Sequence, residues 1–446
     1  MGPVFLRHGS WLLVLPLVLA ATSWGRHLEA AAPATEAQSG NFSDYEGLAA
    51  AAVRGTTSAN FTKKSFAVDL KMPDGSARTF PLLGMPEDDE WILYGGDELD
   101  LTQGMRTVYC EVFLVDDGRP LSPSHYYGIF IGEEKPKRAK ERVDIQKLDA
   151  NVSLSGGYLW IFDNDNIQAG DVLFGPAQGW ENPFQLKYPG KKDATPGMLA
   201  WITDSINQFQ AALEAPNWLT ASPDYTSLID GPNWVDYFLL VELTKNPDGY
   251  RGSTYMHKDR DGPLRMGPAW DYNEAFGECC GYPLHGWQRN GQSGPGVSGG
   301  SAISPEGFRF NICADPGRCL VEPGDGTSRW YRRMWQDPRY RQATALRWRE
   351  LRAGPWSDAA ITALIQSCAT QIKPAVIRNY AKYEKVLLKA WYPDSLTQWT
   401  TEVANLQSWL LAHVAWLDTA FEKTAASDTA VGNATAQAVR AASSLP

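Results

Sequence analysis

Helical periodicity dominates the second half of the chain, whereas short apolar and alternating runs dominate the first half. Trp234, Tyr237, Phe238 and Val241 recur at i, i+3, i+4 and i+7, the apolar stripe of an amphipathic helix. The same period predicts helices over residues 196–214, 233–245, 328–351, 357–388 and 398–424. Strands are predicted over residues 61–70, 109–115 and 126–131. Strands early and helices late predict an α+β fold with two lobes, the first rich in strands and the second in helices.

A predicted β-hairpin interrupts the helical half. The helix ends near Asn246-Pro247, because proline cannot continue the backbone ladder, and Asp248-Gly249 is a strong turn signal. A strand over 253–258, a turn over 259–263 and a returning strand over 264–270 follow. Asp248 and Asp271 then stand at opposite ends of the hairpin. If the hairpin forms, its two ends meet, and so do the two aspartates.

This layout is the one that phosphoryl transfer uses in the larger lobe of protein kinases. There the first carboxylate orients or deprotonates the attacking hydroxyl, and the second holds Mg²⁺ on the nucleotide phosphates. Asn273, two residues beyond Asp271, can share that metal, or it caps a turn. On layout alone, the interpretation of Asp248 and Asp271 as ordinary turn residues is favoured, since Asp-Gly and Asn-Pro are common in loops.

A longer resemblance reverses that preference. The stretch Asn246 to Gly277 resembles the signature N-x-D-G-Y-R-x-S-T-Y-x-x-K-D-R, then G-P-x-W-D-x-[ND]-x-A-F-G, of the CotH family, the spore-coat-type atypical kinases. Similar stretches lie at 125–148, 156–158, 184–189 and 330–352, so the resemblance covers about residues 80–420. It implies a divergent protein-kinase-like fold and phosphorylation of serines in partner proteins, dependent on ATP and on Mg²⁺ or Mn²⁺. By this resemblance Asp248 matches the catalytic aspartate and Asp271 the metal-binding aspartate.

Three further side chains are candidates for the nucleotide site. Lys187, in the run FQLKYP, either pairs the nucleotide phosphates as a strand lysine does in kinases or is a solvated edge residue. Glu134 and Arg142 belong to a charged run that is either part of the phosphate site or a solvated face. Ser253 stands five residues after Asp248, where protein kinases place a metal-binding asparagine.

One segment departs from the family pattern, and another is a long insertion. Between Trp91 and Val112 the family usually carries a helix with an L-x-R-N-type motif, and here the chain is shorter, which could loosen nucleotide binding. Residues 279–325, rich in Gly, Pro and Ser, follow the AFG sequence where protein kinases carry the activation loop. They are either a functional loop that shapes the acceptor site or a tolerated surface insertion.

The chain's opening predicts export. Residues 1–25 have a basic start, an apolar run from Trp11 to Ala21 and small residues after it, as in a secretory signal peptide. A membrane anchor needs about 20 apolar residues, whereas this run is shorter and Pro16 interrupts it. We therefore expect a secreted or secretory-lumen protein without a membrane span. Four N-x-[ST] glycosylation sequons agree, at Asn41, Asn60, Asn151 and Asn433.

The cysteines bear on the compartment of the protein, and the net charge bears on its class of binding partner. Six cysteines allow disulfides in an oxidising compartment: Cys110, Cys279, Cys280, Cys313, Cys319 and Cys368. A local bridge from Cys313 to Cys319, or from the vicinal pair to either, is the most plausible, although connectivity cannot be deduced from sequence. The net charge of −10 argues against nucleic acid and is compatible with a basic, serine-rich protein acceptor.

The predicted organisation is a linker over 26–60, a kinase-like domain over 61–424 and a disordered tail over 425–446. Within the domain, the small lobe covers about 61–190 and the large lobe about 191–424. Two alternatives to a kinase stay open. One is an inactive coat or surface protein that keeps the fold for binding. The other is a glycoside hydrolase, which suits the 18 tryptophans but not the D-x-N arrangement.

Overall fold

The computed structural model describes residues 12–21, 45–55, 62–95, 106–114, 122–163, 167–273, 275–277, 304–310 and 326–443. The chain forms two compact units, one from residues 1–136 and 366–401 and the other from residues 137–365 and 402–446. The described residues contain two antiparallel sheets and six α-helices, so the predicted mixture of strands and helices is confirmed.

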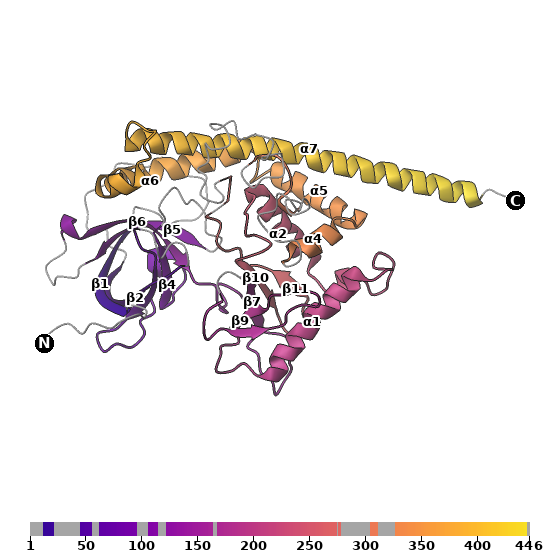
Figure 1. Ribbon diagram of the computed structural model, residues 1–446, viewed down its shortest axis with the longest axis horizontal. Coiled ribbons are helices and arrows are strands. Elements are labelled where there is room, and N and C mark those ends of the chain that lie inside the picture. Colours follow the sequence, from indigo (N-terminus) through magenta and orange to yellow (C-terminus); the bar gives the residue numbers. More distant parts are fainter. Residues whose placement is uncertain are drawn as a thin grey trace. The chain divides into compact units, whose positions relative to one another are not determined.

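The first unit is a closed, six-stranded antiparallel sheet in the order β1-β2-β3-β4-β6-β5 (Figure 1). Its strands are β1 Leu12–Ala21, β2 Tyr45–Val53, β3 Phe66–Lys71, β4 Glu90–Tyr94, β5 Thr107–Leu114 and β6 Tyr126–Glu134, with 3-10 turns η2 Leu82–Gly84 and η3 Pro123–His125. Leu70, Trp91, Val112 and Phe130 are buried inside the sheet. These inward side chains come from different strands, and their burial is what stabilises the closed sheet.

A helix distant in sequence completes this unit. The helix α6 (Asp358–Leu387) carries Arg378, whose Nε and Nη2 donate to the two carboxylate oxygens of Glu111 on β5 at 2.7 and 2.5 Å. The next residue, Asn379, accepts the backbone N–H of Ile129 on β6 with its Oδ1 at 3.2 Å. Because Glu111 is buried, this bidentate pair fixes the part of α6 that belongs to the first unit.

The second unit has a five-stranded antiparallel sheet in the order β11-β10-β7-β9-β8 (Figure 1). Its strands are β7 Tyr158–Phe162, β8 Val172–Phe174, β9 Phe184–Tyr188, β10 Thr254–Lys258 and β11 Leu264–Met266. Its helices are α1 Pro196–Glu214, α2 Gly231–Thr244, α4 Ser328–Met334, α5 Pro338–Arg352 and α7 Ser395–Ser443, the last shared with the first unit, and a 3-10 turn η5 Tyr225–Ser227. Helix α2 packs against both α5 and β11.

Aromatic side chains form the core between these helices. Trp234 of α2 and Trp330 of α4 are fully buried, with ring centroids 6.0 Å apart, and Phe209 of α1 lies 5.1 and 5.2 Å from them. Trp348 and Trp409 are also buried. These tryptophans occupy the apolar faces of helices, as their spacing predicts, so they supply core packing rather than a sugar-binding surface.

Several predicted boundaries are wrong. Asp337-Pro338 divides the helix predicted over 328–351, because the Asp337 carboxylate caps α5 by accepting the N–H of Arg339 at 2.9 Å. The predicted linker contains β2, and the predicted disordered tail continues α7 to Ser443. Strands β7 to β9, which were expected in the small lobe, belong to the second compact unit, which begins at Lys137. The lobe boundary near residue 190 stays a prediction.

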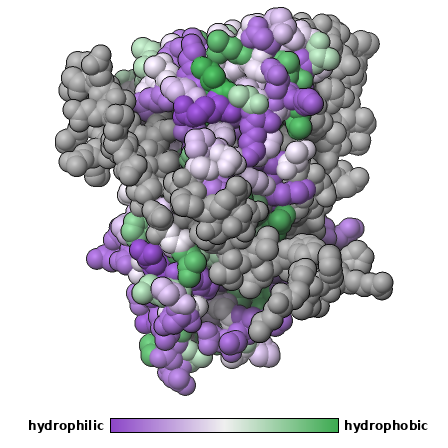
Figure 2. All heavy atoms as spheres, turned by 90° about the vertical axis from the view of Figure 1, so that its left-hand side faces the viewer, coloured by the Kyte–Doolittle hydropathy of each residue, from purple (hydrophilic) through white to green (hydrophobic). Residues whose placement is uncertain are grey.

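The apolar run at the start of the chain forms a strand. Leu12–Ala21 pairs with β2 on one side and β5 on the other. Its assignment to a signal peptide stays a prediction. In the described part of the chain, no helix is both long and apolar enough to cross a membrane. On the face drawn in Figure 2, the described residues are predominantly hydrophilic, with hydrophobic residues interspersed among them.

The predicted hairpin is present. Strands β10 and β11 pair antiparallel, with Met256 opposite Met266 and Lys258 opposite Leu264. The returning strand ends at Met266 instead of residue 270, because Gly267-Pro268 follows and proline has no N–H to donate to a ladder. Strand β10 also pairs with β7, so the hairpin is an extension of the five-stranded sheet.

The hairpin turn is docked at its tip. Asp259 accepts the backbone N–H of Gln146 at 2.7 Å, and Asp261 accepts the hydroxyl of Ser155 at 2.6 Å. Gly156 allows this close approach, because a Cβ there would stand 2.1 Å from the carbonyl oxygen of Asp259. The Gly-Gly-Tyr stretch therefore has a packing reason.

We predict that Gly156→Ala lowers the free energy of unfolding by about 1–3 kcal/mol, the usual cost of an overpacked site. The reason is that the backbone at Asp259 must move to admit the methyl group. Urea unfolding measures the change. Gly262→Ala is the control, since its Cβ would be no closer than 3.6 Å to any neighbour. Equal stability of the two variants would contradict this account of the turn.

Candidate active site

Helix α2 ends in a tight loop that carries Asp248. Lys245, the residue after Thr244, adopts a left-handed conformation with φ 50°, and Pro247 prevents the helix from resuming. Asp248 then opens a turn, in which its carbonyl accepts the N–H groups of Arg251 and Gly252, each at 2.9 Å. The loop leaves a buried helix, as predicted.

The next residue packs directly on α2. A Cβ at Gly249 would stand 2.6 Å from Cγ1 of Val241, so the backbone approaches the helix more closely than any larger residue permits. The hydroxyl of Tyr237, one turn earlier on α2, donates to the carbonyl of Gly249 at 2.9 Å. The helix that precedes the loop therefore also fixes the backbone just after Asp248.

Asn246 joins the two segments that carry the aspartates. Its side-chain oxygen accepts the N–H of Asp248 at 3.0 Å, and its side-chain nitrogen donates to the carbonyl of Asp271 at 3.1 Å. Asn246 is buried, so these bonds are shielded from water. The loop after α2 and the segment after β11 are thus in direct contact, at the place where the hairpin ends were predicted to meet.

The carboxylates themselves lie around one bend, at Gly252 and Ser253. The Ser253 hydroxyl donates to Oδ2 of Asp271 at 3.1 Å. The β and γ carbons of Asp248 lie 3.7 Å from the position that a Cβ on Gly252 would take. Both aspartates are partly exposed, whereas Gly252 and Ser253 are buried. The side chains can therefore reach a ligand while the backbone beneath them is fixed.

Backbone strain is concentrated here. Six non-glycine residues in the described part of the chain have positive φ, and four of them belong to this site: Lys245 (50°), Ser253 (47°), Asp271 (62°) and Phe276 (58°). Such conformations cost on the order of 1 kcal/mol each and persist where surrounding contacts determine them. The Ser253–Asp271 bond and the bond from Phe276 N–H to the Thr244 carbonyl, 2.7 Å, are such contacts.

The donor set at the Asp271 end suits a hard divalent cation. Asp271 offers carboxylate oxygens, and Asn273, two residues further and also partly exposed, offers an amide oxygen. The Ser253 hydroxyl stands beside the carboxylate. Mg²⁺ and Mn²⁺ prefer oxygen ligands of these kinds, so these residues fit a metal of that class.

A comparison with protein-family models gives the family to which this chain belongs. The model described as CotH kinase protein matches residues 101–417, most of the chain. The chain belongs to the CotH kinase family. A comparison with curated proteins gave no match. The family match includes the loop after α2, the β10–β11 hairpin and both aspartates, so the predicted resemblance is confirmed. Strands β1 to β4 lie before the matched residues.

The predicted phosphate-site residues belong to different elements of the fold. Lys187 on β9 is exposed, and its Nζ donates to the side-chain oxygen of Gln185 at 3.1 Å. Gln185 in turn donates to the carbonyl of Asp163, the residue after β7, at 2.6 Å. Strand β9 lies between β7 and β8, and its pairing with β8 covers Phe184 to Leu186. Lys187 is linked to Asp163 through Gln185.

Glu134 and Arg142 belong to different units. Glu134 is buried at the end of β6 in the first unit, where both of its oxygens accept from Arg106, each at 2.8 Å. Arg142 is partly buried in the second unit, in a turn closed by its N–H on the carbonyl of Ala139 at 3.0 Å. The charged run is therefore not a uniform solvated face, since its first member is an internal ion-pair partner.

A buried carboxylate, that of Glu242, supports the Asp248 loop, and no motif or spacing marked it for this role. Glu242, in the last turn of α2, accepts the Tyr250 hydroxyl at 2.7 Å and the backbone N–H groups of Arg309 and Phe310 at 2.5 and 3.0 Å. Burial raises the pKa of Glu242 to about 7, because desolvation outweighs these donors and the nearby guanidinium. Residues 304–310 of the insertion are thus attached to α2.

Two basic side chains, Lys245 and His413, complete this support. Lys245 Nζ donates to the carbonyls of Ser304, at 2.6 Å, and of Glu306, and burial lowers its pKa to about 7. His413 on α7 has Nδ1 2.6 Å from the carbonyl of Pro305 and Nε2 2.6 Å from that of Glu242. Desolvation and Lys245 lower the pKa of His413 to about 4, so at neutral pH the ring has one N–H and donates to one carbonyl at a time.

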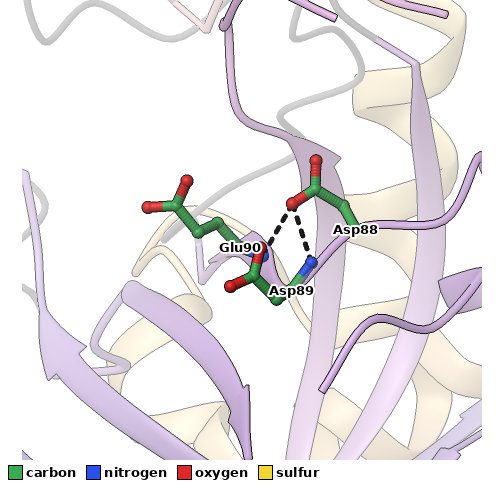
Figure 3. A group of neighbouring side chains, drawn as sticks. All are labelled: Asp88, Asp89 and Glu90. Atoms are coloured by element: carbon green, nitrogen blue, oxygen red, sulfur yellow. Dashed lines mark hydrogen bonds between the residues drawn. The ribbon is translucent and has the colours of Figure 1, made fainter. Parts of the chain in front are cut away.

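A second group of carboxylates lies in the first unit, away from these residues in the chain. Asp88, Asp89 and Glu90 have oxygens within 4.8 Å of one another. Asp88 accepts the backbone N–H groups of Asp89 and Glu90 at 2.7 and 3.0 Å (Figure 3). Glu90 also forms an ion pair with Lys135 at 2.7 Å. These contacts stabilise the turn that enters β4, which explains the cluster structurally.

The described residues do not test the predicted disulfides fully. Cys110 and Cys368 are not joined to each other. The bridge predicted among Cys279, Cys280, Cys313 and Cys319 lies outside the described residues. The shortened segment after Trp91 lies partly outside them as well, between β4 and β5.

We predict that Glu242→Gln removes a pH dependence of stability. Because the folded pKa of Glu242 is raised above its ordinary value of 4.5, the folded state binds this proton more tightly than the unfolded state. Its contribution is complete below pH 4.5 and is lost as the pH rises toward about 7. The difference in free energy of unfolding, wild type minus variant, should therefore fall over this range and then level off.

Urea unfolding at a series of pH values measures this difference. Glu306→Gln is the matched control, because Glu306 lies on the same supported segment but is exposed. Its curve should run parallel to that of the wild type. A parallel curve for Glu242→Gln would contradict the raised pKa.

Proposed function

We propose that this protein transfers the γ-phosphate of ATP to serine side chains of a partner protein, with Mg²⁺ or Mn²⁺ as the metal. The family supports kinase chemistry in general. The observation that carries the specific proposal is the pair of contacts made by Asn246 and Ser253, which hold Asp248 and Asp271 around one bend. Phosphoryl transfer depends mainly on positioning and on electrostatic stabilisation, and this geometry supports both.

Asp248 is the proposed base. Its carboxylate accepts the proton of the acceptor serine hydroxyl as the serine oxygen bonds to the γ-phosphorus and the bond from that phosphorus to the β–γ bridging oxygen breaks. ADP leaves with the electron pair of that bond. The turn that opens at Asp248 and the packing of Gly249 on Val241 hold the backbone of this base in one conformation. A fixed base removes an entropic cost from the transfer step.

Asp271 and Asn273 are the proposed metal ligands. The metal supplies positive charge that offsets the charge on the transferring phosphoryl group. The Ser253 hydroxyl donates a hydrogen bond to Asp271 and so orients the carboxylate. Lys187 and Arg142 are retained as nucleotide-site residues in the proposal, with Lys187 acting from the exposed face of β9.

The proposed acceptor is a basic, serine-rich protein outside the cytosol. The net charge of −10 favours association with a cationic partner. The basic and apolar opening of the sequence supports export, and the sequon at Asn151 lies in an exposed turn where a glycan can be attached.

We predict that Asp248→Asn and Asp271→Asn each lower phosphate transfer by at least about 100-fold. The first change removes the base and the second removes a charged metal ligand. Purified protein with Mg²⁺ or Mn²⁺, γ-labelled ATP and a basic serine-rich acceptor measures incorporation. Asp261→Asn, at the exposed tip of the same hairpin, is the matched control and should keep activity within a few-fold of wild type.

Binding separates the two roles. Stabilisation of the protein by Mg-ATP in a thermal-shift titration should persist in Asp248→Asn and weaken in Asp271→Asn. Phosphate incorporation that persists in Asp271→Asn would contradict the proposal. Absence of transfer by the wild type would instead favour an inactive binding protein, and polysaccharide cleavage that depends on Asp248 would favour a hydrolase.

We also predict that the exported chain begins after about residue 25, where a signal peptidase would act on the predicted leader. Expression in a eukaryotic secretory host and N-terminal sequencing of the medium fraction test this. The mature chain would lack β1, leaving β2 and β5 as open sheet edges. Asn151→Gln should remove one glycan from its mass. Intracellular retention of a chain that still starts at Met1 would contradict the prediction.

A further inference from the structure

A segment of the insertion lies directly beneath the proposed catalytic loop. Arg309, in the sequence that follows the AFG motif, is buried, with 3 % of its surface exposed. Its Nε donates to the carbonyl of Asn246 at 3.1 Å, and its Nη2 donates to the carbonyl of Pro247. These carbonyls belong to the two residues immediately before Asp248. The guanidinium therefore binds the backbone of the two residues that precede the proposed base.

The contact is reciprocal. The backbone N–H of Arg309 donates to Glu242 at 2.5 Å, and Glu242 also accepts the N–H of Phe310. Helix α2 therefore holds the segment by its backbone, while the segment holds the loop after α2 by a side chain. A buried guanidinium is costly unless its donors are satisfied, and its rigid fork suits two adjacent acceptors. Lysine offers a single point charge instead of this fork.

Other contacts anchor the segment independently of Arg309. Lys245 and His413 reach the carbonyls of Ser304 and Pro305. Phe308 packs among aromatic rings, with centroids 5.2 Å from Trp335, 5.0 Å from Trp416 and 5.4 Å from both Phe310 and Phe421. Loss of the Arg309 side-chain contacts should leave the segment in place. It should release only the backbone before Asp248.

We propose that Arg309 is a positioning residue for the transfer step, which it serves by fixing the Asn246 and Pro247 carbonyls and hence the orientation of Asp248. This inference rests on the proposed function. It also assigns a role to the insertion: residues 304–310 and the catalytic loop move as one body, so a partner that displaced this segment would also displace the base.

Arg332 provides a matched comparison. Its Nη1 donates to the carbonyl of Phe310 at 3.4 Å and to Ser328 at 3.5 Å. Arg332 therefore contacts the same segment from a partly buried position, and the acceptors of these two bonds lie outside the catalytic loop. A role limited to holding the segment predicts similar effects for changes at Arg309 and Arg332, whereas a positioning role predicts an effect on catalysis at Arg309 alone.

The kinetic test compares Arg309→Lys and Arg309→Gln with Arg332→Lys. We expect kcat to fall roughly 10- to 100-fold in the Arg309 variants, the scale of a small misplacement of a catalytic group. The KM for ATP should stay within about two-fold, because the metal end of the site is untouched. Arg332→Lys should keep kcat within about two-fold. Unchanged kcat in folded Arg309→Lys, or an equal fall in Arg332→Lys, would overturn the proposal.

Hydrogen exchange supplies a readout that needs no activity. Amides of residues 246–252 should exchange faster in Arg309→Lys than in wild type, while those of Phe308 and Phe310 change little. If the wild type transfers no phosphate, the proposed function fails, and exchange still decides whether Arg309 holds the loop. Unchanged exchange over 246–252 would refute the coupling. Arg309→Lys, which keeps the charge, serves if Arg309→Gln does not fold.

Discussion

The carboxyl end of helix α2 is the constraint on which this site depends. The last carbonyls of an α-helix have no partner within the helix, and here they are buried. Two of them are partnered by distant segments. The Glu242 carbonyl faces His413 of α7, and the Thr244 carbonyl accepts the N–H of Phe276 after the hairpin. Just beyond the helix, the Asn246 carbonyl accepts from Arg309 of the insertion. The hydrogen bonds to these carbonyls therefore bring α7, the segment after the hairpin and the insertion together at the end of α2.

The same requirement explains why the charges are buried together. Glu242 carries the negative charge, and Lys245 and Arg309 carry or can carry positive charge within the same cluster. Alone, each would be expensive to desolvate, but their carbonyl, amide and hydroxyl partners satisfy the donors and acceptors. Burial still dominates, since it raises the pKa of Glu242 and lowers that of Lys245 to about 7 in both cases. A small change in exposure would shift either group's charge near neutral pH.

Local signals explain what the sequence predicted well. The period of α2, the Asn-Pro stop and the turn residues at 259–263 act between near neighbours, so α2 and the hairpin appear where expected. Helix α1 was predicted to the residue because Thr195 caps it and Pro196 begins it. The family signature added the interpretation of Asp248 and Asp271, which turn chemistry alone would have left as loop residues.

Long-range pairing explains what the sequence did not predict. Arg309 and His413 lie 63 and 171 residues from their partners at Asn246 and Glu242, and neither has a spacing that marks it. The β2 strand was taken for linker because its alanine-rich sequence has weak strand propensity, yet pairing with β1 and β3 overrides it. The composition of residues 425–446 likewise suggested disorder, but a run of Ala, Thr and Ser can continue a helix that has already begun at Ser395.

Ser253 shows how the strained backbone and the proposed chemistry fit together. Asparagine adopts positive φ more readily than serine, so conformation does not explain why the shorter residue stands at φ 47°. The hydrogen bond does, since the Ser253 hydroxyl donates to Asp271 at 3.1 Å from a buried position. Asp271 is itself left-handed, and the bond between the two side chains offsets part of the cost of both conformations. At this position serine therefore acts on the carboxylate that would hold the metal, by fixing its orientation, instead of lending a strong ligand of its own.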